Sequence, residues 1–183
     1  MTTTRIGLAG YGFGGRIFHA PLIAAAGGAE LAGVITRSPE RRAEVAADHP
    51  GVPVFDALAD LREAGADAVA ISTPAETHIP LLLEALSLGL AVVCDKPFAL
   101  DAAQAREAVE AAEAAGVVLS VYQNRRWDSD FLTVKRLLAD GSLGTGSLSS
   151  PRCSRPQRSG DSVYQSAPGR SPAISAGSCP SMP

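Results

Sequence analysis

The chain has 183 residues, a formal net charge of −3 and 46% hydrophobic residues. Because this acidic balance offers no basic face to neutralise a phosphate backbone, it argues against nucleic acid as the main partner. No apolar run approaches the roughly 18–20 residues of a membrane span, and residues 1–5 do not begin a secretory signal, so we expect a cytoplasmic protein with no membrane partner.

Short apolar runs alternate with segments of helical periodicity between residues 5 and 121. This alternation predicts an α/β protein with a doubly wound parallel sheet. The runs are apolar on both faces, as in a sheet that helices cover on both sides. The predicted strands are 6–9, 31–36, 52–55, 68–72, 91–94 and 117–121. The predicted helices are 14–26, 39–48, 57–64, 77–88 and 102–115, followed by one that starts near 131 and ends near 140.

Several of these helices have recognisable boundary residues. Ser38 and Asp101 stand where an N-cap side chain would accept a backbone hydrogen bond. Gly65, Gly89 and Gly116 stand where a helix ends on a left-handed residue. The boundaries therefore support the helices that periodicity predicts.

The most informative motif is G-Y-G-F-G-G at residues 10–15, directly after the first strand and at the start of a helix. In a G-x-G-x-x-G motif, Gly10 permits the tight turn, Gly12 lets the backbone approach a pyrophosphate, and Gly15 lets the helix pack on the strand. Phe13 and Gly14 belong to the same turn. The motif predicts a dinucleotide site of Rossmann type, and the alternative is a glycine-rich turn with no ligand.

The end of the second strand indicates which dinucleotide is bound. Glu30 lies 20 residues after Gly10 but at the wrong end of that strand to hold a ribose. The carboxyl end instead carries Thr36, Arg37 and Ser38, with two more arginines one helical turn later. This polar and cationic cluster suits a 2′-phosphate, so we predict NADP in preference to NAD, and the missing acid argues against FAD and S-adenosylmethionine. The alternative is a solvated helix face.

Two other segments fall at carboxyl ends of strands, where open α/β sheets bind ligands. Thr73 and Pro74 end the fourth strand, and His78 follows near the start of the next helix. Lys96, which Pro97 restricts to extended backbone, follows the fifth strand and is a candidate donor to a substrate oxygen. The alternatives are a helix-terminal histidine without a ligand and a surface lysine.

Four segments together resemble one known family, the NAD(P)-dependent oxidoreductases that include glucose-fructose oxidoreductase, inositol 2-dehydrogenase and MocA. The segments are G-Y-G-F-G-G-R-I-F-H-A-P at 10–21, I-S-T-P-A-E-T-H at 71–78, C-D-K-P-F at 94–98 and Y-Q-N-R-R-W-D-S-D-F at 122–131. The resemblance implies a Rossmann domain that binds NAD or NADP, and a second α/β domain that carries the substrate site and oligomer contacts.

The resemblance also implies roles for individual residues. Lys96 would be the active-site lysine, with Asp95 where the family more usually has Glu. Thr73, Pro74 and His78 would line the path from adenosine to nicotinamide. Pro97 would shape the turn after Lys96, and Asn124 and Arg125 would lie near the nicotinamide. All six would belong to the cofactor site.

The resemblance ends near residue 145. The family continues with a β-rich domain in which a G-G-G…D-x-G-x-H-like motif supplies a histidine and an acid, whereas residues 146–183 contain no histidine. We therefore expect residues 1–122 to form the NAD(P)-binding domain. Residues 123–145 would form a connecting segment and the first helix of an incomplete substrate domain.

Residues 146–183 are expected to form a largely unstructured tail. They hold 11 Ser, 6 Pro and 4 Gly, a composition that cannot offset its own chain entropy. Two explanations stay open, a shifted reading frame and a natural tail on a shortened protein. The odd cysteine count, Cys94, Cys153 and Cys179, shows no metal-like spacing, so we predict a reducing compartment and no metal site.

Three hypotheses for function follow. The first is hydride transfer between NADP(H), or else NAD(H), and a sugar or polyol, with Lys96 as the catalytic residue. The second is a nucleotide-binding module without turnover. The third is a poorly folded truncation product. The family forms homo-oligomers, but the oligomer contacts belong to the second domain.

Overall fold

The computed structural model describes residues 3–144, so the predicted tail lies outside the described residues. Six parallel strands form one sheet in the order β3-β2-β1-β4-β5-β6. The strands are β1 Thr4–Ala9, β2 Ala29–Ile35, β3 Val54–Phe55, β4 Ala68–Ile71, β5 Ala91–Cys94 and β6 Leu119–Val121. This order confirms the predicted doubly wound sheet.

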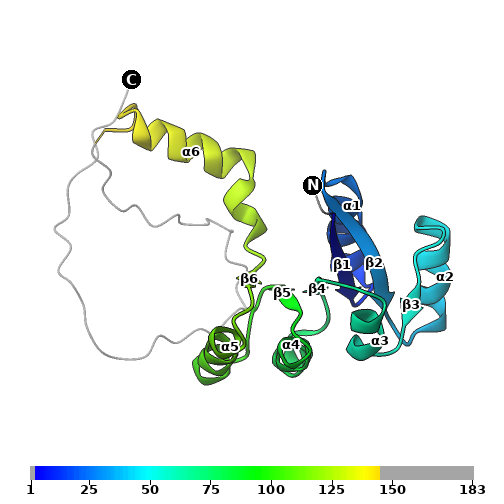
Figure 1. Cartoon of the computed structure of the whole chain (residues 1–183). Coiled ribbons are helices and arrows are strands. Elements are labelled where there is room, and N and C mark those ends of the chain that lie inside the picture. The colour runs from blue at the N-terminus through cyan, green and yellow to red at the C-terminus, as the bar shows by residue number, and fades with distance from the viewer. Residues whose placement is uncertain (1–2, 145–183) are drawn as a thin grey trace, which may run out of the picture.

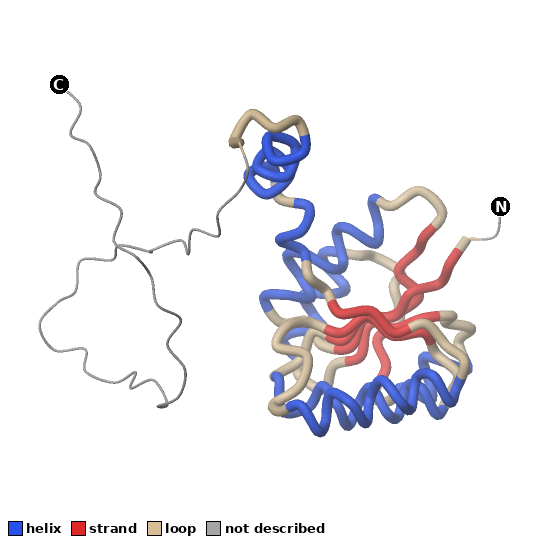
Figure 2. Tube along the Cα trace, turned by 90° about the vertical axis from the view of Figure 1, so that its left-hand side faces the viewer, coloured by secondary structure: helices blue, strands red, loops and turns tan. Residues whose placement is uncertain are grey.

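Helical segments connect the strands and cover both faces of the sheet, which Figure 2 shows nearly edge-on. They are η1 Gly15–His19, α1 Ala20–Ala25, α2 Pro39–Asp48, α3 Leu58–Glu63, η2 Ala75–Thr77, α4 His78–Ser87, α5 Ala102–Ala115, η3 Asn124–Trp127 and α6 Ser129–Ala139. One apolar core lies between the sheet and α1 and α2, around Leu8 and Val45. The other lies between the sheet and α3, α4 and α5, around Leu61 and Leu82.

The predicted helix boundaries agree with those of the structure to within two residues. The Ser38 hydroxyl accepts from the Arg41 backbone N–H at 3.3 Å, and Asp101 accepts from two backbone N–H groups at the start of α5. Gly116 ends α5 with a φ of +66°. The first predicted helix differs in detail, because its opening turn η1 is a π-helix.

Backbone hydrogen bonds continue past the carboxyl ends of the strands and join the residues that follow them to the neighbouring strands. The backbone N–H of Ser72 donates to Ala9 O at 2.8 Å, that of Asp95 to Ile71 O at 3.0 Å, and that of Tyr122 to Cys94 O at 2.8 Å. The chain winds from β1 to β3 in one direction and returns to β4 beside β1, so the crevice between β1 and β4 is the topological switch point of the sheet.

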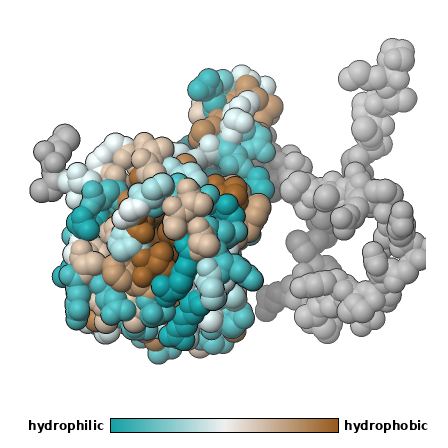
Figure 3. Space-filling model, turned by 90° about the vertical axis from the view of Figure 1, so that its right-hand side faces the viewer, coloured by the Kyte–Doolittle hydropathy of each residue, from teal (hydrophilic) through white to brown (hydrophobic). Residues whose placement is uncertain are grey.

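Helix α6 stands away from the sheet after β6 (Figure 1). It contains no buried residue, and its apolar side chains Phe131, Val134 and Leu138 are each about half exposed. The space-filling view shows hydrophobic residues among hydrophilic ones on the projection at the top of the molecule (Figure 3). Within residues 3–144, no helix is long and apolar enough to span a membrane.

We predict that Gly7→Ala lowers the free energy of unfolding by about 1–3 kcal/mol, the usual cost of overpacking a core. Gly7 lies in β1, and a Cβ there would overlap with the side chain of Leu61, which is fully buried. Chemical denaturation followed by circular dichroism measures the change. Gly27→Ala is the matched control, since its Cβ would meet nothing, and we expect it to change stability by less than about 0.5 kcal/mol. Equal stability of the two variants would contradict this account of the core.

Candidate functional site

The glycine turn after β1 is built by contact between backbones. Gly10 has a φ of +94°, and a Cβ there would overlap with the carbonyl oxygen of Ser72. A Cβ on Gly15 would overlap with the carbonyl oxygen of Gly10, so the first helical turn lies directly on the end of β1. Gly12 differs, because its Cβ would meet only the Arg41 guanidinium, 3.8 Å away. Of the three motif glycines, Gly10 and Gly15 are therefore closed against the protein backbone, and Gly12 is open to a ligand.

The first cavity, of about 490 Å³, opens beside this turn at the ends of β1, β2 and β4. Ile35, Pro74 and Leu81 supply apolar surface, while Arg37 and Arg41 supply positive charge. The remaining lining residues are Ala9, Gly10, Thr36, Asp56, Thr73, Glu76, Thr77 and Pro80. An apolar pocket with a cationic margin can hold an adenine ring and an adjacent phosphate.

Not every member of the predicted cationic cluster faces this cavity freely. Arg42 pairs with Asp56 at 2.6 Å, whereas Arg37 and Arg41 form no salt bridge with residues 3–144. Ser38 caps α2 and donates its backbone N–H to the Thr36 hydroxyl at 3.3 Å, so both of these side chains support the start of the helix.

Glu30 lies at the opposite end of β2. This position is the predicted one. Glu30 pairs there with Arg5, beside the start of β1, so it is remote from the first cavity.

The second cavity, of about 280 Å³, lies on the other side of the turn at the ends of β5 and β6. Lys96 lines it and is exposed, and the peptide bond between Lys96 and Pro97 is cis. Phe13 and Phe18 stand edge to face at its margin, with ring centroids 5.7 Å apart. The other lining residues are Gly14, His19, Asp95, Tyr122, Asn124 and Arg125.

The carboxylate of Asp95 is fixed at the back of this cavity. His19 Nε2 lies 2.8 Å from Oδ1, and the Ser72 hydroxyl donates to Oδ2 at 2.7 Å. Burial by itself would raise the pKa of Asp95, but the hydrogen bonds from His19 and Ser72, with the charges of His19 and His78, outweigh burial and lower the pKa. Asp95 is therefore an ionised group whose two oxygens are both bound by the protein.

His78 does not line either cavity, contrary to its predicted place on the cofactor path. Its ring is 1% exposed, with Nε2 lying 2.9 Å from Thr73 O and Nδ1 lying 2.9 Å from Pro97 O. The reason is that α4 starts at this residue and carries the ring beneath the two loops. His78 thus links the loops that hold Thr73 and Pro97.

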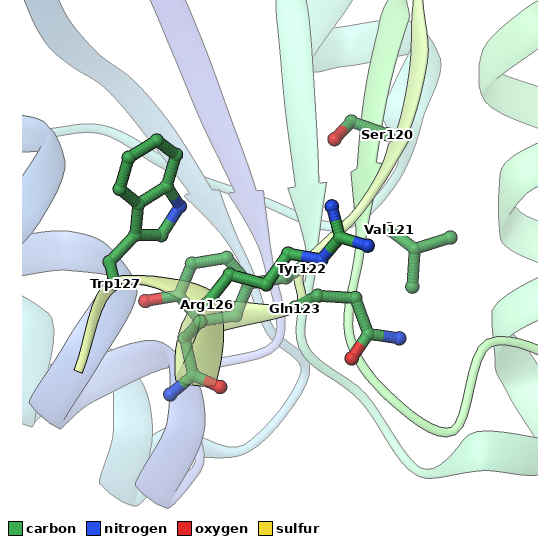
Figure 4. Close-up of a pocket in the computed structure, with 7 residues that line it drawn as sticks. Ser120, Val121, Tyr122, Gln123, Arg126 and Trp127 are labelled. Atoms are coloured by element: carbon green, nitrogen blue, oxygen red, sulfur yellow. The ribbon is translucent and has the colours of Figure 1, made fainter. Parts of the chain in front are cut away.

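A third cavity, of about 290 Å³, lies along the segment that follows β6. Figure 4 shows Gln123, Arg126 and Trp127 projecting from this segment. Asn124 lines both the second and third cavities, and Arg125 is exposed and pairs with Asp128 at 2.8 Å. Amide, guanidinium and indole groups therefore adjoin the lysine cavity.

The sequence did not single out four residues of the second cavity or its wall: Phe18, His19, Ser72 and Tyr122. Ser72 ends a strand at the ligand-binding edge, a signal that the sequence contains. Tyr122 begins the polar segment after β6. His19 offers no such signal, because only the π-helical turn brings its ring to Asp95.

The family model described as "Oxidoreductase family, NAD-binding Rossmann fold" matches residues 4–123. The uncharacterised oxidoreductase YdgJ of Escherichia coli is 51% identical over 141 residues, which cover 76% of this chain and 40% of that protein. The scyllo-inositol 2-dehydrogenase (NADP(+)) IolW of Bacillus subtilis is 35% identical over 144 residues, covering 78% and 39%.

A solved structure is similar over the same region. The scyllo-inositol dehydrogenase of Lactobacillus casei, with bound NAD(H) and scyllo-inositol, is 28% identical with a TM-score of 0.70, over 78% of this chain and 43% of that one. The chain thus spans about 40% of the length of the curated relatives that it matches.

We predict that Asp95→Asn destabilises the protein most at neutral pH and progressively less in acid. A carboxyl whose pKa is lowered by folding stabilises the native state above its unfolded pKa of about 3.9, and this stabilisation disappears as the pH falls through the folded pKa. The difference in unfolding free energy between wild type and variant should therefore shrink as the pH falls from neutral through the unfolded pKa and on through the lower folded pKa. Denaturant titrations at several pH values measure it. Glu107→Gln, on the exposed side of α5, is the control, and a pH-independent difference for Asp95→Asn would contradict the assignment.

Proposed function

Because this chain belongs to the GFO/IDH/MocA oxidoreductase family, whose Rossmann fold binds NAD, we propose that it binds a nicotinamide dinucleotide and serves hydride transfer to or from a sugar or polyol. One observation carries the proposal. Two cavities flank the open glycine turn, one with a cationic margin and one that contains Lys96. A dinucleotide laid across the turn would place its two halves in the two cavities.

We further propose NADP as the preferred cofactor. Support comes from Arg37, just after β2, and from Arg41, in the first turn of α2. NAD-specific sites hold a carboxylate for the ribose at this end of the strand. Of the two acids that line the first cavity, Asp56 is paired with Arg42, and Glu76 comes from the segment after β4. The relative IolW is named for NADP, whereas the Lactobacillus casei structure contains NAD(H).

Lys96 is the proposed catalytic residue. The nicotinamide, when bound, supplies the hydride acceptor or donor. Lys96 would hydrogen-bond the reacting oxygen of the substrate. In oxidation, Lys96 would accept the O–H proton of the reacting hydroxyl as the carbonyl forms, and in reduction it would return that proton to the oxygen. Support comes from the position of Lys96 in the second cavity, beside the glycine turn.

A sugar or polyol is the proposed substrate class. Relatives named as scyllo-inositol dehydrogenases support this class, and so do the amide, guanidinium and indole groups of the third cavity, which suit a hydroxylated ring. Assembly into a homo-oligomer is also a proposal from the family. Since the chain spans about 40% of its relatives, a nucleotide-binding module without turnover is the second candidate.

NADPH titration tests the proposed function. We expect NADPH fluorescence to change on binding, and the melting temperature to rise by several degrees at 100-fold excess over Kd, where ligand binding adds about 2.7 kcal/mol of stability. Absence of both signals at millimolar NADPH would show that the proposal is wrong.

The cofactor preference is tested by Arg37→Asp. We expect this variant to weaken NADPH binding about tenfold or more, since it replaces a cation with an anion beside the 2′-phosphate, and to change NADH binding by less than about threefold. Arg106→Asp, which removes an exposed arginine on α5, controls for net charge. If both variants bind NADPH equally well, the ribose pocket has been misplaced.

The role of Lys96 is tested by NADP-dependent turnover of a panel of sugars and polyols. Lys96→Ala should lower kcat by about 10²-fold or more while NADPH binding stays within about twofold, because general acid–base catalysis typically contributes 10²–10⁴-fold. Lys135→Ala on the exposed face of α6 is the matched control. Equal turnover by wild type and Lys96→Ala would remove Lys96 from the mechanism, and NADPH binding without any turnover would favour the binding module.

A further inference from the structure

The Asp95 carboxylate and the His19 ring together join four separate segments of the chain. Asp95 follows β5, receives a hydrogen bond from Ser72 after β4, and contacts His19 in η1. The His19 ring packs in turn on Tyr122 after β6, with centroids 4.5 Å apart and planes tilted by 48°. A single imidazole therefore links the first helical turn to the ends of the fifth and sixth strands.

This network also contacts the glycine turn. A Cβ on Gly14 would lie 2.5 Å from Ser72 Oγ and 3.2 Å from Asp95 Oδ2, so the turn approaches the carboxylate closely. The side chains of His19 and Asp95 are 6% and 21% exposed. Because a buried carboxylate oxygen left without a donor is costly, loss of the imidazole would displace Asp95 and the loop that continues into Lys96.

The hydrogen bond to Asp95 defines which His19 nitrogen carries a hydrogen. A carboxylate only accepts, so Nε2 is the donor. Within residues 3–144, every buried polar side-chain atom has a hydrogen-bond partner. Nδ1 of His19 has no partner among those residues, so this atom is accessible to solvent. His19 also lines the second cavity, so its ring adjoins any ligand that occupies that cavity.

We propose that His19 is the positioning residue for the nicotinamide half of the cofactor, because it holds Asp95 and the Lys96 loop against the glycine turn. This inference rests on the proposed function. It also predicts that the two halves of the site are separable, since none of His19, Ser72 and Asp95 lines the first cavity. Changes at His19 should therefore affect only ligands that reach the second cavity.

The test compares two ligands by isothermal titration calorimetry, NADPH and 2′,5′-ADP, the second of which has no nicotinamide. We expect His19→Ala to raise the Kd of NADPH about tenfold and that of 2′,5′-ADP by less than about twofold. His19→Gln should stay within about threefold of wild type for both ligands, because its amide can donate to Asp95 and its oxygen can accept. His49→Ala, a histidine outside the second cavity, should bind both ligands as wild type does.

Three results would overturn the inference: unchanged NADPH binding by His19→Ala, equal weakening of both ligands, and no recovery in His19→Gln. If His19→Ala does not fold, Ser72→Ala serves instead, since it removes the other donor to Asp95. We expect Ser72→Ala to bind NADPH about threefold more weakly than wild type. If Ser72→Ala binds NADPH as tightly as wild type does, the proposed role of the hydrogen-bond network is wrong. If the wild-type protein binds neither ligand, the proposed function itself fails. If the wild-type protein binds both ligands and the variants have unchanged Kd values, only the role of His19 is rejected.

Discussion

The close approach of the glycine turn to the neighbouring backbone is the constraint on which the rest of the site depends. Because Gly10 has no Cβ, its backbone can lie against the carbonyl of Ser72, and because Gly15 has none, the first helical turn begins directly on the end of β1. That placement brings His19 within hydrogen-bonding distance of Asp95, two strands away in the sheet. Any side chain at either glycine would push the helix outward, and the ring of His19 would then lose its contact with the carboxylate.

Much of the fold could be predicted from the sequence because its signals are local. Apolar runs identified all six strands, and the capping residues Ser38 and Asp101 act on backbone groups two or three residues away. The opening π-helical turn had no such signal, because it is selected by packing on the end of β1. The position of Glu30 at the far end of β2 followed from the direction of the strand alone.

The site was predictable to the extent that it follows from the parallel sheet. A residue after a strand lies at the ligand-binding edge, which is why Lys96 and Arg37 line cavities in the structure. Partnerships between distant residues were not predictable in the same way. Both ring nitrogens of His78 lie 2.9 Å from backbone carbonyl oxygens beneath the loops, and Arg42 pairs with Asp56. Neither side chain is therefore available to a ligand, although their positions in the sequence suggest that they would be.

Two adjacent residues of the second cavity, Asp95 and Lys96, have different roles. Both oxygens of Asp95 are bound by protein donors, and its lowered pKa keeps it ionised at neutral pH. To exchange a proton with a ligand, it would have to give up a hydrogen bond of the network, at a cost of about 1–3 kcal/mol. Lys96 forms no salt bridge with residues 3–144 and lies exposed in the same cavity, so it can meet a ligand without any such loss. Under the proposed function, the carboxylate is therefore the anchor of this loop and the amine is its reactive group.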